Sequence, residues 1–218
     1  MKVVVTSGPT REPVDDVRFI SNVSSGRLGC SVATAFSSAG HQVRLLSGPG
    51  ALIPPECETL VVEEITTATS LLDALTREVE SVSPPDLLVH AAAVADYAPI
   101  KAEGKIKSTE PELLLRMAPT PKVVDGVRRL APNLAIILFK LESGIDRDEL
   151  HRRARAAMAR VGGAAVVANL LDEVGVDGHR ADLLRADGSC LPLDGREAIA
   201  TSLVTEAERI VLARREAT

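Results

Sequence analysis

The stretch RFISNVSSGRLG, residues 18–29, lies between the first predicted strand and the first predicted helix. It is longer than a tight turn between a strand and a helix requires. Ser24 or Ser25 can cap the helix that begins near Gly26. The free N–H groups and the positive end of the helix dipole then form a site for an anion, which is most often a phosphate. An ordinary serine cap followed by a basic first turn is the simpler alternative.

A βαβ unit surrounds this stretch. The β-branched run KVVVT, residues 2–6, predicts a buried strand that ends at Ser7-Gly8-Pro9. Residues 26–39 have the apolar spacing of a helix with Gly40 as its C-terminal stop, and residues 42–46 predict the next strand.

The same alternation continues to the end of the chain. Further strands are predicted at 60–63, 86–91, 113–117, 134–139 and 164–169, and further helices at 67–82, 121–130, 146–161 and 195–213. Residues 181–185 and 190–193 predict a hairpin, and residues 97–108 a mobile polar loop. We therefore predict one domain over residues 1–218, a doubly wound, mostly parallel Rossmann-like α/β sheet with helices on both faces. The hairpin and the loop at 97–115 are expected as a small extension outside that alternating pattern.

Composition limits the partners of the protein. Of its 218 residues, 45% are hydrophobic and only 2% aromatic, as expected for aliphatic strands buried on both faces. The net charge of −5 and the few aromatic rings argue against a nucleic-acid partner. Three cysteines without a C-x-x-C pair indicate reduced thiols rather than a disulfide framework or a zinc site. We expect a cytoplasmic protein with no membrane partner, because neither a signal peptide nor a membrane-spanning run is apparent.

Ligands of such sheets bind at the carboxyl ends of the strands. The polar groups that the predicted loops offer there are Asn22, the Ser24-Ser25-Gly26 helix start, Asp96, Lys105, Lys107, Lys140 and Asn169. No Ser–His or Cys–His nucleophile can be traced, and His90, at the end of an apolar strand, is expected to be a hydrogen-bonded structural histidine. These residues are suited to binding phosphates and a carboxylate while negative charge develops during a reaction.

Two features would suggest a dehydrogenase. The first is the βαβ start of the chain, but its first turn lacks the G-x-G-x-x-G dinucleotide fingerprint, because Pro9 and a long insertion follow Gly8. Tyr97 and Lys101 have the Tyr-x-x-x-Lys spacing of short-chain dehydrogenases, which works when both residues share a helix face. Pro99 lies between them and disfavours a helix, so the spacing is interpreted as accidental.

Several separated motifs agree with one family. TSGPTREP, residues 6–13, and VRFISNVSSGRLG, residues 17–29, resemble the opening of the phosphopantothenoylcysteine synthetase (phosphopantothenate–cysteine ligase) family. AAAVADY at 91–97, KIK at 105–107 and VVAN at 166–169 match later family motifs in the same order. In many bacteria this domain follows a flavin-dependent decarboxylase, so the chain resembles the free-standing form and no flavin is implied.

The resemblance implies a two-step ligation in coenzyme A biosynthesis. A nucleoside triphosphate, with CTP favoured over ATP, would activate the carboxylate of 4′-phosphopantothenate as an acyl-nucleotide with loss of pyrophosphate. The amine of L-cysteine would then form the amide. Mg²⁺ is implied as cofactor, with its protein ligands unassigned, and a homodimer as the assembly.

The resemblance also implies residue roles. Asn22 and Lys105 are expected to be catalytic, with the Asn22 amide donating to the carboxylate and the acyl intermediate. Arg18 and Asn169 join Asn22 in binding substrate. The implied nucleotide-binding residues are Gly8, Ser24, Ser25, Gly26, Ala92, Asp96, Phe139 and Lys140.

Departures from the family pattern keep alternatives open. Gly8-Pro9 stands where the family has two glycines, which changes the backbone donors available to phosphate. LFKLES, residues 138–143, is closer to the eukaryotic run, so Lys140 could contact phosphate and ATP stays open as the nucleotide. A nicotinamide-dependent reductase and a non-catalytic nucleotide-binding module are the two alternative functions.

Overall fold

A mostly parallel sheet forms the centre of the protein in the computed structural model, which describes residues 1–55, 57–107, 112–175 and 178–216. Its order is β12-β11-β10-β9-β6-β1-β4-β5. The six parallel strands are β1 (Lys2–Ser7), β4 (Gln42–Ser47), β5 (Leu60–Glu64), β6 (Leu87–His90), β9 (Ala135–Glu142) and β10 (Ala165–Leu170). The antiparallel strands β11 (Arg180–Arg185) and β12 (Cys190–Asp194) complete one edge.

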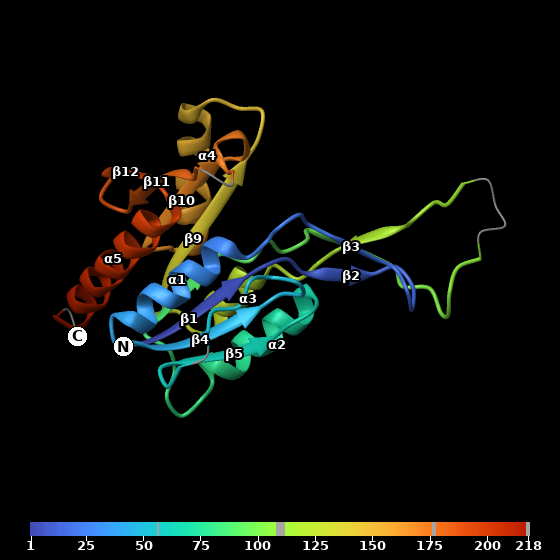
Figure 1. The fold of residues 1–218 in the computed structure, drawn as a ribbon, viewed down its shortest axis with the longest axis horizontal. Coiled ribbons are helices and arrows are strands. Elements are labelled where there is room, and N and C mark those ends of the chain that lie inside the picture. The colour runs from blue at the N-terminus through green and yellow to red at the C-terminus, as the bar shows by residue number, and fades with distance from the viewer. Residues whose placement is uncertain (56, 108–111, 176–177, 217–218) are drawn as a thin grey trace.

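Helices cover both faces of the sheet (Figure 1). They are α1 (Arg27–Ser38), α2 (Ala68–Val79), α3 (Val123–Leu130), α4 (Arg147–Val161) and α5 (Arg196–Glu216). Successive residues of β1 point to opposite faces, so Val3 and Val5 join the core cluster under α1 and α5, whereas Val4 joins the one under α2, α3 and α4. The predicted fold class is confirmed.

Two small sheets lie beyond the carboxyl edge of the main sheet. In one, β2 (Arg11–Pro13) pairs with β3 (Phe19–Ser21), and in the other β7 (Tyr97–Pro99) pairs with β8 (Met117–Pro119). The described residues between β7 and β8, 100–107 and 112–116, project away from the helices as a long arm (Figure 1). The end of the predicted loop at Ser108 lies outside the described residues.

The predicted hairpin extends the main sheet, because β11 pairs antiparallel with β10 and continues it. One prediction beyond the sheet was wrong. The strand predicted at 113–117 is displaced to Met117–Pro119, and Leu114 is exposed. This leucine run resembles a buried strand in sequence, but no neighbouring strand pairs with it in the described arm.

A short 3-10 turn, η1 (Leu171–Glu173), follows β10. Among the described residues, none of the helices combines the length and the apolar character needed to cross a bilayer.

Candidate functional site

The candidate site lies where the strand order reverses. From β1 the chain moves outward through β4 and β5, then returns to β6 on the other side of β1 and continues to β9 and β10. The loops after β1 and β6 start on either side of this switch point and are joined there by main-chain hydrogen bonds. The carboxyl edge at the switch point is the usual position of the ligand crevice in such sheets.

Close main-chain packing fixes the β1 side of the crevice. Ser7 is fully buried at the end of β1, and its hydroxyl donates to the carbonyl of Gly26 at 3.1 Å. A Cβ added to Gly29 would lie 2.3 Å from the Ser7 Oγ. Helix α1 can therefore cross the end of β1 only because residue 29 has no side chain, which is the role of the third glycine in a dinucleotide fingerprint.

The start of α1 differs from the sequence prediction. The residue at the N-cap is Gly26, in the left-handed region with φ 67°, and no side chain caps the helix. The predicted cap by Ser24 or Ser25 was wrong, because the helix begins one residue later and Ser24 Oγ accepts only the Gly26 N–H, at 3.4 Å. The first turn also carries no acidic residue. The positive end of α1 thus stays available to an anion.

Asn22 connects the two sides of the crevice. Its amide nitrogen donates to the carbonyls of Ala93, at 3.3 Å, and Val94, at 3.0 Å, in the loop after β6. Ala93 also donates its N–H to the carbonyl of Gly8 at 2.8 Å. The predicted residues Gly8, Asn22, Gly26 and Ala92 are therefore brought together at one place.

His90 and Thr6, at the ends of β6 and β1, hold the start of the loop after β6 in place. Thr6 Oγ1 accepts the N–H of Ala92 at 3.1 Å and lies 3.0 Å from His90 Nδ1. A hydroxyl can donate one hydrogen bond and accept two, so Thr6 can hold the main chain of Ala92 and the ring of His90 at the same time. Burial lowers the pKa of His90 to about 4, so the ring is neutral at pH 7. This is the hydrogen-bonded structural histidine expected from the sequence.

The second part of the site is the arm, which is fastened to the loop between β2 and β3. The buried Asp15 carboxylate accepts from Arg18 Nε at 2.9 Å and from the N–H of Ile106 at 3.0 Å. Arg18 in turn donates to the Ile106 carbonyl at 2.7 Å. The hydrogen bonds from Arg18 hold the pKa of Asp15 far below its usual range, with smaller contributions from main-chain N–H groups. The loop predicted to be mobile is thus held along the β2–β3 loop.

Lys105 and Arg18 have different surroundings in this arm. Lys105 is exposed, one residue before the fastened Ile106. The Arg18 guanidinium, expected to bind substrate, pairs with Asp15 and positions the arm. Lys107 is likewise exposed.

The remaining predicted residues come from loops and strand ends along the same edge, and each has partners of its own. Exposed Asp96, at the base of the arm, pairs with Lys122 at 2.6 Å. Lys140, near the end of β9, pairs with Glu142 at 2.9 Å, and the neighbouring Phe139 packs against the core. Asn169, at the end of β10, is buried.

Ser25 has one main-chain role. Its carbonyl accepts the N–H of Leu52 at 2.9 Å, which ties the loop before α1 to the loop after β4.

Sequence reasoning missed a cavity of about 550 Å³ beside this crevice. It is lined by parts of 11–19, 47–53 and 64–67, including Arg11, whose guanidinium lies 4.4 Å from the centre of the Phe19 ring. A repeated motif could have revealed it, because Ser-Gly-Pro follows both β1 and β4 at paired positions of the two strands. The two turns pack so closely that a Cβ on Gly48 would lie 1.9 Å from the Pro9 carbonyl oxygen.

Glu12 is another residue that the sequence did not single out. Its carboxylate is buried and accepts the N–H of Ala68, the first residue of α2, at 2.8 Å. This bond anchors β2 to the N-terminus of a core helix, where a negative charge is favoured.

The geometry does not fit a short-chain dehydrogenase. Tyr97 lies in strand β7, and Lys101 pairs with Asp16 at 2.7 Å. The two residues do not share a helix face, so their spacing is accidental, as interpreted from Pro99.

Comparisons with known proteins identify relatives over nearly the whole chain. A family model described as DNA/pantothenate metabolism flavoprotein C-terminal domain matches residues 1–210. Coenzyme A biosynthesis bifunctional protein CoaBC of Thermococcus kodakarensis is 35% identical over 212 residues, which cover 96% of this chain and 51% of that protein. The chain therefore spans about half the length of this relative.

Solved structures agree in fold. The crystal structure of the DNA/Pantothenate Metabolism Flavoprotein from Streptococcus pneumoniae has a TM-score of 0.89 and 29% identity, covering 96% of this chain and 99% of that one. A Cab2 mutant in complex with phosphopantothenate-cysteine has a TM-score of 0.77 at 22% identity, covering 99% of this chain and 89% of that one. At that identity the likeness concerns the fold alone.

Proposed function

The chain belongs to the family of the DNA/pantothenate metabolism flavoprotein C-terminal domain, and we propose that it is a phosphopantothenate–cysteine ligase of coenzyme A biosynthesis. The motifs at 6–13 and 17–29 support this activity, as does the role in coenzyme A biosynthesis that the name of its Thermococcus relative gives to that protein. The observation that carries the proposal is the crevice in which Asn22, the uncapped start of α1 and the β6 loop meet.

The proposed reaction has two steps. A carboxylate oxygen of 4′-phosphopantothenate attacks the α-phosphorus of the nucleotide, and pyrophosphate leaves. The amine of L-cysteine then attacks the acyl carbon, the nucleoside monophosphate leaves, and the nitrogen loses a proton. Both steps bring anions together, so fixed positive dipoles and cations at the meeting point lower the barrier.

The residues of the crevice suit the anionic part of this chemistry. In our proposal the main-chain N–H groups at the start of α1, with Gly8, Ser24, Ser25, Gly26 and Ala92, bind phosphate oxygens. Asn22 orients the acyl group, and its neutral amide does not compete with the cysteine amine as a nucleophile. Asn169 is proposed to contact the substrate from the end of β10.

Residues of the arm and of β9 would complete the site. Lys105, exposed beside the fastened Ile106, would neutralise developing phosphate charge. Asp96 is proposed to accept from the ribose, and Phe139 and Lys140 to contact the nucleotide. We favour CTP over ATP, with the Lys140 run as the feature that keeps ATP in competition.

An oxygen ligand suited to Mg²⁺ lies in the lining of the neighbouring cavity. Glu64 is part of that lining, and Mg²⁺ usually binds one or two carboxylates together with substrate phosphates. A carboxylate there fits the ion, which would supply charge neutralisation to the triphosphate. No flavin is required by the reaction. We further propose that residues 1–218 act as one ligase domain, in a cytoplasmic homodimer.

Pyrophosphate release tests the proposed activity. Protein with L-cysteine, Mg²⁺ and either CTP or ATP should release pyrophosphate only when 4′-phosphopantothenate is added. Nucleotide binding without turnover would favour the non-catalytic nucleotide-binding module and contradict the ligase. Comparing initial rates with CTP and with ATP at equal concentrations decides between the two nucleotides.

A further inference from the structure

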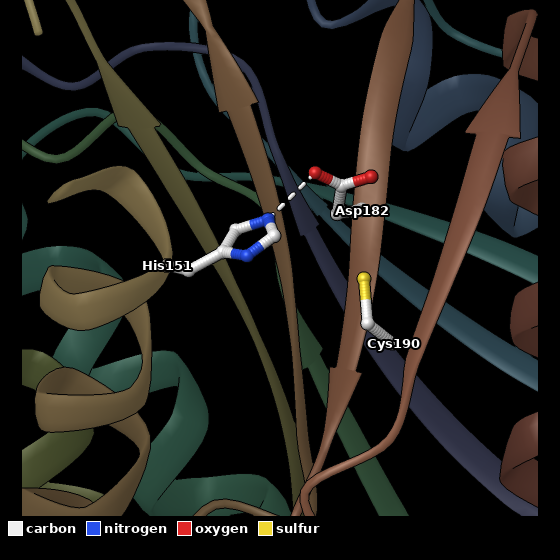
Figure 2. A group of neighbouring side chains, drawn as sticks. All are labelled: His151, Asp182 and Cys190. Carbon is white, nitrogen blue, oxygen red and sulfur yellow. Dashed lines mark hydrogen bonds and ion pairs between the residues drawn. The ribbon is translucent and has the colours of Figure 1, made fainter. Parts of the chain in front are cut away.

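A second group of reactive side chains lies at the β12 edge of the sheet. His151, Asp182 and Cys190 each present one ligand atom, and these atoms lie within 4.8 Å of one another (Figure 2). The group is the candidate metal-binding cluster found among the described residues. None of its members belongs to the ligase site proposed above.

The fold places these three side chains on one face. Asp182 pairs with Pro192 across β11 and β12, so Cys190 is its diagonal neighbour two positions along the partner strand. Asp182 also pairs with Ala168 of β10, which faces α4. The His151 side chain points from α4 toward the Asp182 carboxylate, as Figure 2 shows. The three ligands thus come from α4, β11 and β12, a spacing that no local sequence motif reveals.

We propose that His151, Asp182 and Cys190 bind a transition-metal cation of the Zn²⁺ class. One imidazole, one carboxylate and one thiolate form the mixed ligand set that such ions accept, whereas Mg²⁺ and Ca²⁺ do not favour sulfur. Three protein ligands leave a fourth tetrahedral position for water.

The geometry requires only a small adjustment. Ligand atoms around tetrahedral Zn²⁺ lie about 3.3–3.8 Å apart, given metal–ligand distances of about 2.0–2.3 Å. His151 Nε2 and Asp182 Oδ2 are now 2.7 Å apart in a hydrogen bond. A cation between them would replace this hydrogen bond, and the Cys190 sulfur would move toward the cation.

The surroundings favour an anionic carboxylate in a fixed position. Arg147, one turn before His151 on α4, donates to Asp182 Oδ2 at 2.6 Å. Arg147 and His151 both bond to Oδ2 of this carboxylate. Arg147 also pairs with Glu173, so the guanidinium that holds the Asp182 carboxylate is itself held in position. Such outer contacts orient metal ligands in known sites.

The proton balance is simple. Burial, together with the Asp182 charge, raises the pKa of the Cys190 thiol, so the sulfur is protonated in the metal-free protein. On binding, the thiol releases its proton to solvent, and the imidazole coordinates through a ring nitrogen that carries no proton. The cation thus takes the place of the thiol proton in the site.

A titration of the full chain tests the site. Protein freed of metal by dialysis against a chelator is titrated with Zn²⁺ and, in parallel, with Co²⁺ as a spectroscopic substitute. We expect one equivalent to bind, with thiolate-to-cobalt charge-transfer absorption. At Zn²⁺ 100-fold above the dissociation constant, the melting temperature should rise by roughly 5 °C.

Matched variants locate the ion. Cys190→Ser and His151→Ala should abolish the charge-transfer band, whereas Cys57→Ser and His41→Ala, which change an exposed thiol and an imidazole elsewhere, should retain it. Circular dichroism of the metal-free variants verifies that they are folded. Absence of binding by the wild-type chain, or retention of the band by either Cys190→Ser or His151→Ala, would overturn the proposal. These readouts do not involve ligase turnover, so failure here leaves the proposed activity untouched.

Discussion

The two regions that meet at the candidate site are held by different forces. At the crevice between β1 and β6, main-chain groups and residues without bulky side chains approach each other closely, as at Ser7, Gly26 and Gly29. At the arm, an ion pair and the hydrogen bonds around it join two loops, with Asp15 and Arg18 at the centre.

This difference predicts two kinds of sensitivity. The crevice should be intolerant of added atoms and of added charge, because its parts are buried and close-packed. The arm should tolerate changes of side-chain size but should depend on the carboxylate that organises it. Each experiment below tests one side of this contrast.

The largest effect is expected from adding one methyl group to the crevice. Gly29→Ala places a Cβ 2.3 Å from Ser7 Oγ and 2.5 Å from Ser7 Cβ, so α1 must move off β1. Overpacking of this kind should lower the free energy of unfolding by about 3 kcal/mol. Denaturant unfolding measures it. The control is Gly178→Ala, where an added Cβ meets no atom of the described residues within 4 Å beyond the chain neighbours, and the change should stay within about 0.5 kcal/mol.

Removing the amide that spans the crevice should impair activity rather than folding. Asn22 is exposed and its side-chain amide donates to two carbonyls at the surface, so Asn22→Ala should unfold at nearly the wild-type temperature. Loss of a group that orients the acyl intermediate should reduce kcat by about 100-fold. Single-turnover formation of acyl-nucleotide is the measurement, and wild-type rates would remove Asn22 from the site.

A lower pH should protonate His90 and thereby place a positive charge at the crevice. Its folded pKa of about 4 lies below the unfolded value of about 6.5, so the unfolded state binds the proton first. Stability from this group is complete above pH 6.5 and is lost as pH falls toward 4, about 2 kcal/mol of it by pH 5.

His90→Gln isolates this contribution, because glutamine offers Thr6 an acceptor but does not titrate in this range. Unfolding free energies of both proteins at pH 7 and pH 5 give the comparison. An equal loss in the two proteins would show that His90 is not the group responsible.

The smallest effect is expected at the arm, where two adjacent carboxylates provide a matched pair. Asp15→Asn removes the charge that holds Arg18 and leaves the arm less firmly attached, so kcat/KM should fall about tenfold. Asp16→Asn breaks only an exposed pair with Lys101 and should change it less than about twofold. Equal effects of the two substitutions would contradict a specific role for Asp15.

The sequence predicted the sheet well because apolar periodicity is a local signal. Runs such as residues 2–6 and 164–169 are buried on both faces, and their strands are where they were predicted. Local signals also explain the errors. A serine next to a glycine indicates a cap, but the positive φ of Gly26 starts α1 one residue later than predicted.

The grouping of the candidate residues was only partly predictable from the sequence. The chain order of the strands placed the loops after β1 and β6 at one edge, which brought Asn22 to Ala93 and Val94. The fastening of the arm through Asp15 and Ile106 joins residues 91 positions apart in sequence. No sequence pattern within either segment predicts such a contact, and the three-residue strands β2 and β3 are too short to show periodicity.

The position of bound phosphate tests the central claim most directly. A crystal of the protein soaked with CTP or ATP and 4′-phosphopantothenate should show phosphate oxygens within about 3 Å of main-chain N–H groups at residues 24–29, with Asn22 beside the acyl group. Phosphates bound at another edge of the sheet, away from residues 22–29, would contradict the account.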